Sequence, residues 1–447
     1  MTTALLTDHY ELTMVRAARA SGMADRHSIF ELFPRRLPEG RRYGVVAGVG
    51  RALRALEEFT FDEPTLDFLL STDVVDEDLA QWLRDYRFSG SIWGYPEGEI
   101  YFPGSPLVVV ESTFAEAVLL ETLLLSIYNH DSAIASAASR MSAMAEGRPL
   151  IEMGSRRTQE RSAVAAARAA YVAGFTSTSN LEAGRSWGIP TSGTAAHSFT
   201  LLHDSEEEAF QAQLQTLGEQ TTLLVDTYDV EEAVRTGVRL TEGRLGAVRL
   251  DSGDLAIAAR EVRDLLDDLG AEQTRIIVTS DLDEWQIAAL RGAPVDGYGV
   301  GTSVVTGSGH PTCGFVYKLV ARADLSSGQM LPVAKKSKNK NTVGGRKYAL
   351  RRLNDHGVAE AEIVGIEAHP ANDGNDRPLH VELVREGEIV SHESVQQGRE
   401  RHLAVRAELP RAALRVSKGE PAIPTVMLED DGDLAHNPYV KGPMPTV

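Results

Sequence analysis

Residues 247–281, AVRLDSGDLAIAAREVRDLLDDLGAEQTRIIVTSD, decide the fold. They contain two short apolar runs, at 247–250 and 276–278, on either side of a helical stretch at 255–269. Each run ends in a polar cluster, DSGD after the first and TSD after the second. A strand, a helix and a second strand in this order are typical of a βαβ unit with parallel strands. The segment therefore predicts an α/β protein.

The same alternation begins at about residue 149 and repeats along the middle of the chain. Further apolar runs start at Leu150, Ile189, Leu223 and Tyr298, and each ends in a polar or glycine-rich cluster. Repeated strand–helix units predict a parallel sheet covered by helices. We interpret the pattern as an α/β barrel. An open doubly wound sheet is the alternative, because alternation alone does not separate the two.

The regions on either side of this alternating segment show a different pattern of predicted elements. The first hundred residues mix helical and strand-like runs, and residues 114–144 predict two helices with a break near 129–131. The tail shows short strand-like runs joined by Gly, Asn and Asp turns. We predict an N-terminal α/β domain at 1–112, a barrel carrying the site at 113–322, and a β-rich segment at 323–447 that packs with the N-terminal domain.

Composition limits the kinds of partner and compartment. The 447-residue chain is 43% hydrophobic and carries a formal net charge of −19, which disfavours nucleic acid. No apolar run approaches the roughly 18 residues that a membrane helix needs. Cys313 is the only cysteine, which fits a reducing, cytoplasmic environment. The basic run from Lys335 to Lys340 is interpreted as a solvated loop, with a phosphate-gripping loop as the alternative.

Candidate site residues follow the predicted strands. In parallel α/β folds, side chains at the carboxyl ends of the strands converge on one mouth. The set combines arginines for phosphate or carboxylate, carboxylates for Mg²⁺ or ribose hydroxyls, one histidine and a Gly-Thr loop, and it predicts a phosphosugar or nucleotide substrate. Its members include Arg156, Arg157, Thr194, His197, Asp226, Arg249, Asp251, Asp254, Gly301 and Thr302.

The arginines have a structural and a functional interpretation. Arg156 and Arg157 could be surface residues, yet a cation at a helix N-terminus opposes the helix dipole unless an anion is near. Arg249 lies within an apolar run, where an unpaired buried charge costs several kcal/mol. It could pair with Asp226 or Asp251, and we favour a paired arginine that faces the substrate.

The remaining candidates are ambiguous in the same way. His197 could be a half-buried histidine with a satisfied ring. Asp251 and Asp254 could cap a helix, or the tight DSGD turn could hold a metal-bound diphosphate or a ribose diol. The loop at 299–303, GVGTS, is similar to a phosphate-binding backbone loop.

The motifs together resemble the nicotinate phosphoribosyltransferase family. The resemblance covers about three quarters of the chain in order, from LLTDHYELTM at 5–14 to VYKLV at 316–320. Between these ends it is carried by EMGSRRTQ (152–159), AAYVAGFTSTSNLEAG (169–184), GIPTSGTAAHSF (188–199), LLVDTYD (223–229), VRLDSGDL (248–255) and GVGTSVVT (299–306).

This resemblance implies an architecture and an activity. The fold would be an irregular, incomplete α/β barrel plus an α/β domain built from the N- and C-terminal parts. The protein would act as a homodimer with shared active sites. It would join nicotinate to 5-phosphoribosyl 1-pyrophosphate in NAD salvage, releasing pyrophosphate and consuming ATP in the presence of Mg²⁺.

The resemblance also implies roles for the substrate-binding residues. Tyr10 would stack on the pyridine ring, contributed by the partner subunit. Thr194 and Arg249 would hold the nicotinate carboxylate. Thr302, in the loop with Gly301, would hold the 5-phosphate of the donor.

Other roles concern the ribose, the metal and ATP. Asp226, Asp251 and Asp254 would order the ribose, Mg²⁺ and the neighbouring arginines, with the metal held between the DSGD aspartates and the diphosphate. His197 would be the residue that ATP phosphorylates. A neutral imidazole can accept a phosphoryl group, which adds about −2 of charge beside the site.

Three other functions are weighed against this one. A nicotinamide or quinolinate phosphoribosyltransferase would share the chemistry, but Thr194 and Arg249 suit a single carboxylate. A non-catalytic sensor of NAD metabolites would share the fold, but His197, Arg249 and the DSGD turn are all retained. An aldolase or isomerase would need a Schiff-base lysine or an acid–base pair at the strand ends, and the sequence offers neither.

Overall fold

The computed structural model describes residues 2–335 and 343–428. Contacts divide the chain into two compact units, one from Met1–Ala133 with Thr312–Val447 and one from Ile134–Pro311. The predicted boundaries at 112/113 and 322/323 therefore both lie inside the first unit. Of the basic run, Lys335 is exposed and the lysines after it lie outside the described residues.

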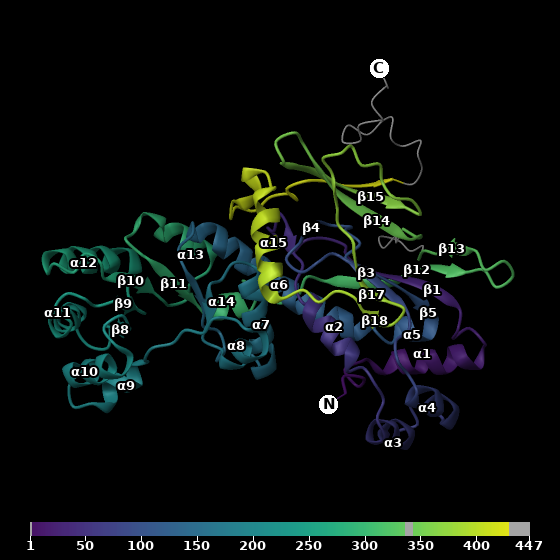
Figure 1. Cartoon of the computed structure of the whole chain (residues 1–447), viewed down its shortest axis with the longest axis horizontal. Coiled ribbons are helices and arrows are strands. Elements are labelled where there is room, and N and C mark those ends of the chain that lie inside the picture. The colour runs from purple at the N-terminus through teal and green to yellow at the C-terminus, as the bar shows by residue number, and fades with distance from the viewer. Residues whose placement is uncertain (1, 336–342, 429–447) are drawn as a thin grey trace. The chain divides into compact units, whose positions relative to one another are not determined.

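The second unit is built on a six-stranded parallel sheet (Figure 1). Strands β8 to β11 are neighbours in chain order, and β11, the last of the unit, pairs with β6, the first. Across the sheet the strands are β7 (Ser177–Thr178), β6 (Leu150–Glu152), β11 (Gly297–Val300), β10 (Arg275–Val278), β9 (Ala247–Leu250) and β8 (Thr222–Leu224). The predicted parallel α/β arrangement is confirmed.

Residues 247–281 form the predicted βαβ unit. Helix α12 (Leu255–Asp268) lies between β9 and β10 in sequence and packs on both strands. Its N-terminus is capped by Asp254, whose Oδ1 accepts hydrogen bonds from the backbone N–H of Ala256 at 3.1 Å and of Ile257 at 3.2 Å. Its buried face consists of Ala259, Val262 and Leu266. This apolar stripe, spaced by three and four residues, holds the helix against the sheet.

Other helices of this unit follow the remaining strands. Figure 1 shows α11, α12 and α13 flanking β8 to β11. The predicted strand at 189–191 is reduced to one bridge between Thr178 and Thr191. The helices are α7 (Glu160–Val172), α8 (Leu181–Trp187), α9 (His197–Leu202), α10 (Glu206–Leu217), α11 (Val230–Leu240), α13 (Glu284–Ala289), the 3-10 helix η1 (Leu290–Gly292) and α14 (Thr302–Val305).

One long helix departs from the sequence prediction. Helix α6 (Glu121–Ala145) runs without interruption through residues 129–131, where a break was predicted. The break lies earlier, between α5 (Phe114–Val118) and α6. The polar residues at 129–131 were misleading because they make contacts within the fold instead of ending the helix. Asp131 is fully buried and pairs with Arg51 at 2.6 Å.

The first unit contains a seven-stranded antiparallel sheet that joins both ends of the chain. Its interior strand β1 pairs with β5 on one side and with β12 on the other. Phe30 stacks on Tyr317 at a centroid distance of 5.0 Å in its core. Across the sheet the strands are β13 (Met330–Pro332), β12 (Phe315–Ala323), β1 (His27–Pro34), β5 (Val108–Thr113), β3 (Ser91–Gly94), β17 (Val381–Arg385) and β18 (Glu388–Ile389).

Smaller elements complete this unit. A four-stranded sheet consists of β16 (Arg377–Pro378), β14 (Lys347–Leu353), β15 (Ala359–Ile366) and β19 (Thr425–Leu428), and a two-stranded one of β2 (Gly44–Val45) and β4 (Ile100–Tyr101). The helices are α1 (His9–Ala20), α2 (Val49–Glu57), α3 (Glu63–Ser71), α4 (Glu77–Arg84), α15 (Val395–Ala407) and the 3-10 helix η2 (Arg411–Leu414).

Helix α15 was missed in the tail that the sequence predicted to be β-rich. A sequence signal for it exists, because Ser394 and Gln397 form a capping box, with Ser394 Oγ accepting from the backbone N–H of Gln397. Among the described residues no helix is both long and apolar enough to cross a bilayer.

A buried carboxyl in the first unit yields a stability prediction. Glu11 on α1 is fully buried, and it accepts hydrogen bonds from Thr7 Oγ1 and from Thr122 N at 2.9 Å. Burial raises the pKa of Glu11 from 4.5 to about 7. Between these values the unfolded chain loses its proton while the folded chain keeps it, so stability falls as pH rises through this window.

Glu11→Gln should therefore leave the melting temperature near that of the wild type at pH 5 and raise it at pH 8. The expected gain in the free energy of unfolding at pH 8 is at most about 3 kcal/mol, because each unit of difference between the folded and unfolded pKa corresponds to ~1.4 kcal/mol. Thermal unfolding at the two pH values measures it, with the exposed Glu57→Gln on α2 as the control. An equal gain at both pH values would contradict the prediction.

Candidate functional site

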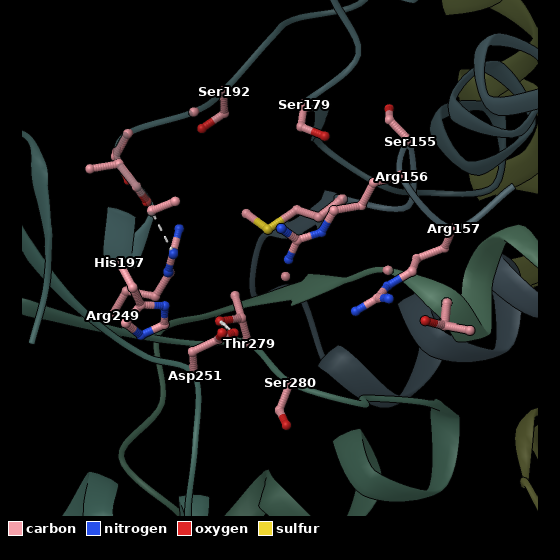
Figure 2. A pocket seen from close by; sticks show the side chains of 18 of the residues that line it. Ser155, Arg156, Arg157, Ser179, Ser192, His197, Arg249, Asp251, Thr279 and Ser280 are labelled. Carbon is pink, nitrogen blue, oxygen red and sulfur yellow. Dashed lines mark hydrogen bonds between the residues drawn. The ribbon is translucent and has the colours of Figure 1, made fainter. Parts of the chain in front are cut away.

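A cavity of about 580 Å³ lies at the carboxyl ends of the parallel strands in the second unit (Figure 2). Its walls come from the segments that follow β6, β9, β10 and β11, and from the loop before α9. Eight of the eleven predicted site residues line it: Arg156, Arg157, Thr194, His197, Arg249, Asp251, Gly301 and Thr302. Residues far apart in the sequence thus meet around one space, as the strand-end argument predicted.

Three guanidinium groups face this cavity. Arg156 and Arg157 are exposed in the turn after β6, and Arg249 projects from β9 (Figure 2). Among the described residues no side-chain hydrogen bond or ion pair engages Arg156 or Arg157. Free guanidinium donors on a chain of net charge −19 create a local site for an anion.

Arg249 is held more firmly than the other two arginines. Its Nη2 donates to the backbone carbonyl of Ala195 at 3.1 Å, and its buried Nε has no partner among the described residues. Burial lowers the pKa of Arg249, while Asp251 and Asp226 oppose that shift. The salt bridge to Asp226 or Asp251 that the sequence offered as an alternative does not occur in the described part of the chain, and the two carboxylates act on Arg249 only at longer range. A partly buried guanidinium whose buried Nε is unused is suited to an anionic ligand.

His197 belongs to a hydrogen-bonded network below the cavity. Its Nε2 lies 3.1 Å from Asp226 Oδ1, and the other carboxylate oxygen accepts from Asp251 N at 2.9 Å and from Ser252 Oγ at 2.7 Å. The side chain of Asp226 is 3% exposed, so its carboxylate contacts the imidazole ring from the protein interior and orients it. A carboxylate beside Nε2 favours the tautomer that carries its proton on Nε2 and leaves the lone pair of Nδ1 free.

The other predicted site residues lie elsewhere. Asp226 supports His197 and does not line the cavity. Asp254 caps α12 through Oδ1, as its structural interpretation predicted. Tyr10 lies on α1 in the first unit, and the residue is 44% exposed.

Among the residues that the sequence argument did not select, two bear on the geometry of the site. Thr279, at the end of β10, lines the cavity and donates through its hydroxyl to Asp251 Oδ1. It lies at the start of the polar cluster TSD, so the signal was present. Glu152, the last residue of β6, is 1% exposed and lies beneath the turn of the two arginines. The sequence analysis included it in an apolar run and in the motif EMGSRRTQ without giving it a role.

The side chains that line the cavity include few groups that could bind a metal ion. No cluster of three or more His, Cys, Asp or Glu side chains with ligand geometry occurs in the described ranges. Asp251 lines the cavity, and Asp254 keeps Oδ2 outside its cap bonds. Mg²⁺ commonly binds to one or two carboxylates and completes its coordination with substrate phosphates and water. Of these two aspartates only Asp251 lines the cavity, so this pair offers one carboxylate there to a magnesium ion that arrives with a diphosphate.

Fold and cavity together define a class: an α/β protein that binds an anionic small molecule at the carboxyl ends of a parallel sheet. Comparisons with known proteins narrow this class. Residues 5–129 match the model of the nicotinate phosphoribosyltransferase N-terminal domain. The chain is 54% identical to a nicotinate phosphoribosyltransferase of Mycobacterium tuberculosis over 434 residues, covering 94% of each protein.

More distant relatives agree. A nicotinate phosphoribosyltransferase of Bacillus subtilis is 37% identical, covering 83% of this chain and 77% of the relative. The crystal structure of human nicotinic acid phosphoribosyltransferase superposes with a TM-score of 0.81 at 26% identity, covering 95% of this chain and 98% of the human one. The chain belongs to the nicotinate phosphoribosyltransferase family, a family of enzymes. The family expected from the sequence motifs is thus confirmed.

Proposed function

We propose that this chain transfers the phosphoribosyl group of 5-phosphoribosyl 1-pyrophosphate to the ring nitrogen of nicotinate, giving nicotinate mononucleotide and pyrophosphate for NAD salvage. One observation carries the proposal: Arg156, Arg157 and Arg249 line the same cavity of an otherwise acidic protein. The donor and the acceptor are both anions, and they would occupy this cavity together.

The proposed roles follow from charge and position. Arg249 and Thr194 hold the nicotinate carboxylate, with the unused Nε of Arg249 as one donor. Arg156 and Arg157 face the diphosphate, and Thr302 with Gly301 holds the 5-phosphate at the start of α14. Because the nicotinate nitrogen is already nucleophilic, the reaction needs no strong general base.

Catalysis would then be mainly electrostatic. The bond from ribose C1 to the pyrophosphate oxygen breaks as the bond to the nicotinate nitrogen forms. Positive charge develops on the sugar and negative charge on the leaving group, so fixed arginines stabilise the transition state more than the substrates. Asp251, Asp254 and the diphosphate would hold Mg²⁺, which supplies additional positive charge to the leaving group.

ATP would act through His197. The free Nδ1 attacks the γ-phosphorus, the bond to the β–γ bridging oxygen breaks, and ADP leaves. The Nε2 proton stays in the hydrogen bond to Asp226, whose carboxylate stabilises the charged phosphoimidazole. Water later cleaves the phosphohistidine, and this step would be coupled to product formation.

The finer architecture is also part of the proposal. The strand order, open between β7 and β8, supports an incomplete barrel, and the first unit supports an α/β domain built from both chain ends. In a homodimer, the exposed ring of Tyr10 from a second copy would stack on the pyridine. The free, buried Cys313 supports a cytoplasmic, reducing location.

A comparison of acceptors tests the function. With phosphoribosyl pyrophosphate, ATP and Mg²⁺, we expect nicotinate to yield its mononucleotide with a kcat/KM at least about tenfold above nicotinamide and quinolinate, because one charged hydrogen bond is worth roughly that factor. Chromatography of the products measures it. A preference for nicotinamide or quinolinate would reassign the substrate. No pyrophosphate release with any acceptor would favour the sensor.

A further inference from the structure

The turn that carries Arg156 and Arg157 is supported by a buried carboxylate. Glu152 ends β6 and is 1% exposed. Its Oε1 accepts from Gly154 N and its Oε2 from Thr178 Oγ1, both at 2.5 Å. No cation of the described residues lies within ion-pair distance of it. The carboxylate therefore acts as a double hydrogen-bond acceptor that joins the turn to β7.

Additional contacts hold the turn from both sides. The backbone N–H of Met153 donates to the carbonyl of Val300 at 2.8 Å, and that of Arg157 to the carbonyl of Gly154 at 2.8 Å. Gly154 has no space for a side chain, because a Cβ there would lie 2.9 Å from the Gly301 carbonyl oxygen and 2.2 Å from Val305 Cγ1. The turn is thus pressed against the Gly-Thr loop at the end of β11.

Thr178 extends this support to the neighbouring loop. Besides donating to Glu152, its hydroxyl accepts from Asn180 N at 3.0 Å. The amide of Asn180 in turn donates to Ser155 Oγ in the arginine turn at 3.0 Å. A closed circuit of hydrogen bonds therefore fixes the backbone from which the two free guanidinium groups enter the cavity (Figure 2).

We infer that Glu152 is a positioning residue that fixes the turn of Arg156 and Arg157, and thereby sets the affinity for the diphosphate of the phosphoribosyl donor. This inference rests on the proposed function, which places the donor in this cavity. Its physical basis is preorganisation: donors that are already aligned bind and stabilise developing charge without the cost of ordering a loop. Nicotinate, held by other residues, should be little affected.

Two pairs of variants test the circuit. Thr178→Val removes the hydroxyl and keeps the side-chain volume, whereas Thr178→Ser keeps the hydroxyl. Glu152→Ala removes both acceptors, whereas Glu152→Gln retains an acceptor for Gly154 N and can donate to Thr178. Thr241→Val is the control, because Thr241 is as fully buried as Thr178 and its hydroxyl binds the Gly237 carbonyl on α11.

We expect Thr178→Val and Glu152→Ala to raise the KM for phosphoribosyl pyrophosphate about tenfold or more, the usual scale of a lost hydrogen bond to a buried charge. The KM for nicotinate should stay within about twofold. The affinity for pyrophosphate, measured by calorimetry, should fall by the same factor by which the KM for the donor rises. Thr178→Ser and Glu152→Gln should recover most of the affinity, and Thr241→Val should retain all of it.

The outcomes separate this inference from the function itself. Unchanged donor KM and pyrophosphate affinity in Thr178→Val, with normal transfer, would overturn the positioning role alone. Equal rises in both KM values would also overturn it, since they would indicate a general loss of structure. If the wild-type protein neither transfers the phosphoribosyl group nor binds pyrophosphate, the proposed function is refuted, and the inference with it. Thr178→Val keeps the test decisive even where Glu152→Ala fails to fold.

Discussion

His197→Ala abolishes the stimulation of nicotinate mononucleotide synthesis by ATP and leaves a slow, ATP-independent transfer. The expected loss is complete for the coupling, because no other histidine lines the cavity in the described part of the chain. The slow transfer persists because the arginines and the nicotinate nitrogen, which carry the chemistry, are unchanged. Initial rates with and without ATP measure the effect, together with labelling of the protein by γ-phosphate-labelled ATP.

Two further variants sharpen this test. His203→Ala is the matched control, because His203 ends the same helix and its Nδ1 lies 2.9 Å from the carbonyl of Phe199, outside the cavity lining. Asp226→Asn should lower the labelling of His197 without removing it, since the amide can satisfy Nε2 but does not stabilise the charged ring. Undiminished labelling of His197→Ala would show that phosphate is carried elsewhere.

Sequence reasoning recovered the convergence of the site because its physical basis is local. A short apolar run followed by polar residues predicts a strand end, and parallel strands bring such ends to one edge of a sheet. This rule alone was enough to select Arg156, Asp251 and Thr302. The same logic could have included Thr279, which begins a polar cluster of this kind.

What the sequence could not provide depends on contacts between distant elements. Whether a carboxylate such as Glu152 is buried depends on which strands pair with its own strand, and no local sequence pattern indicates this pairing. Likewise, Asp226 and Asp254 both follow or border strand ends, yet one orients a histidine and the other caps a helix. The continuous helix through 129–131 shows the same effect, because Arg51 pairs with Asp131 from 80 residues away.

The role of Arg249 leads to the second large effect. Its side chain is partly buried, its Nη2 is bound to the Ala195 carbonyl, and its Nε is unused among the described residues. A buried donor without a partner is costly, so the free protein retains binding energy that a carboxylate can recover. Arg249→Ala should therefore raise the KM for nicotinate by about 10- to 100-fold.

The same variant should change specificity in a defined direction. Nicotinamide lacks the carboxylate charge, so its slow turnover should be nearly unaffected, and the preference for nicotinate should fall by the same factor. Arg249→Lys should have a KM for nicotinate between those of the wild type and Arg249→Ala, because lysine keeps the charge but loses the planar fork of donors. Arg275→Ala is the control, since Arg275 is exposed at the opposite end of the neighbouring strand β10. An unaltered KM for nicotinate in Arg249→Ala would remove this arginine from the acceptor site and leave the carboxylate to Arg156 or Arg157.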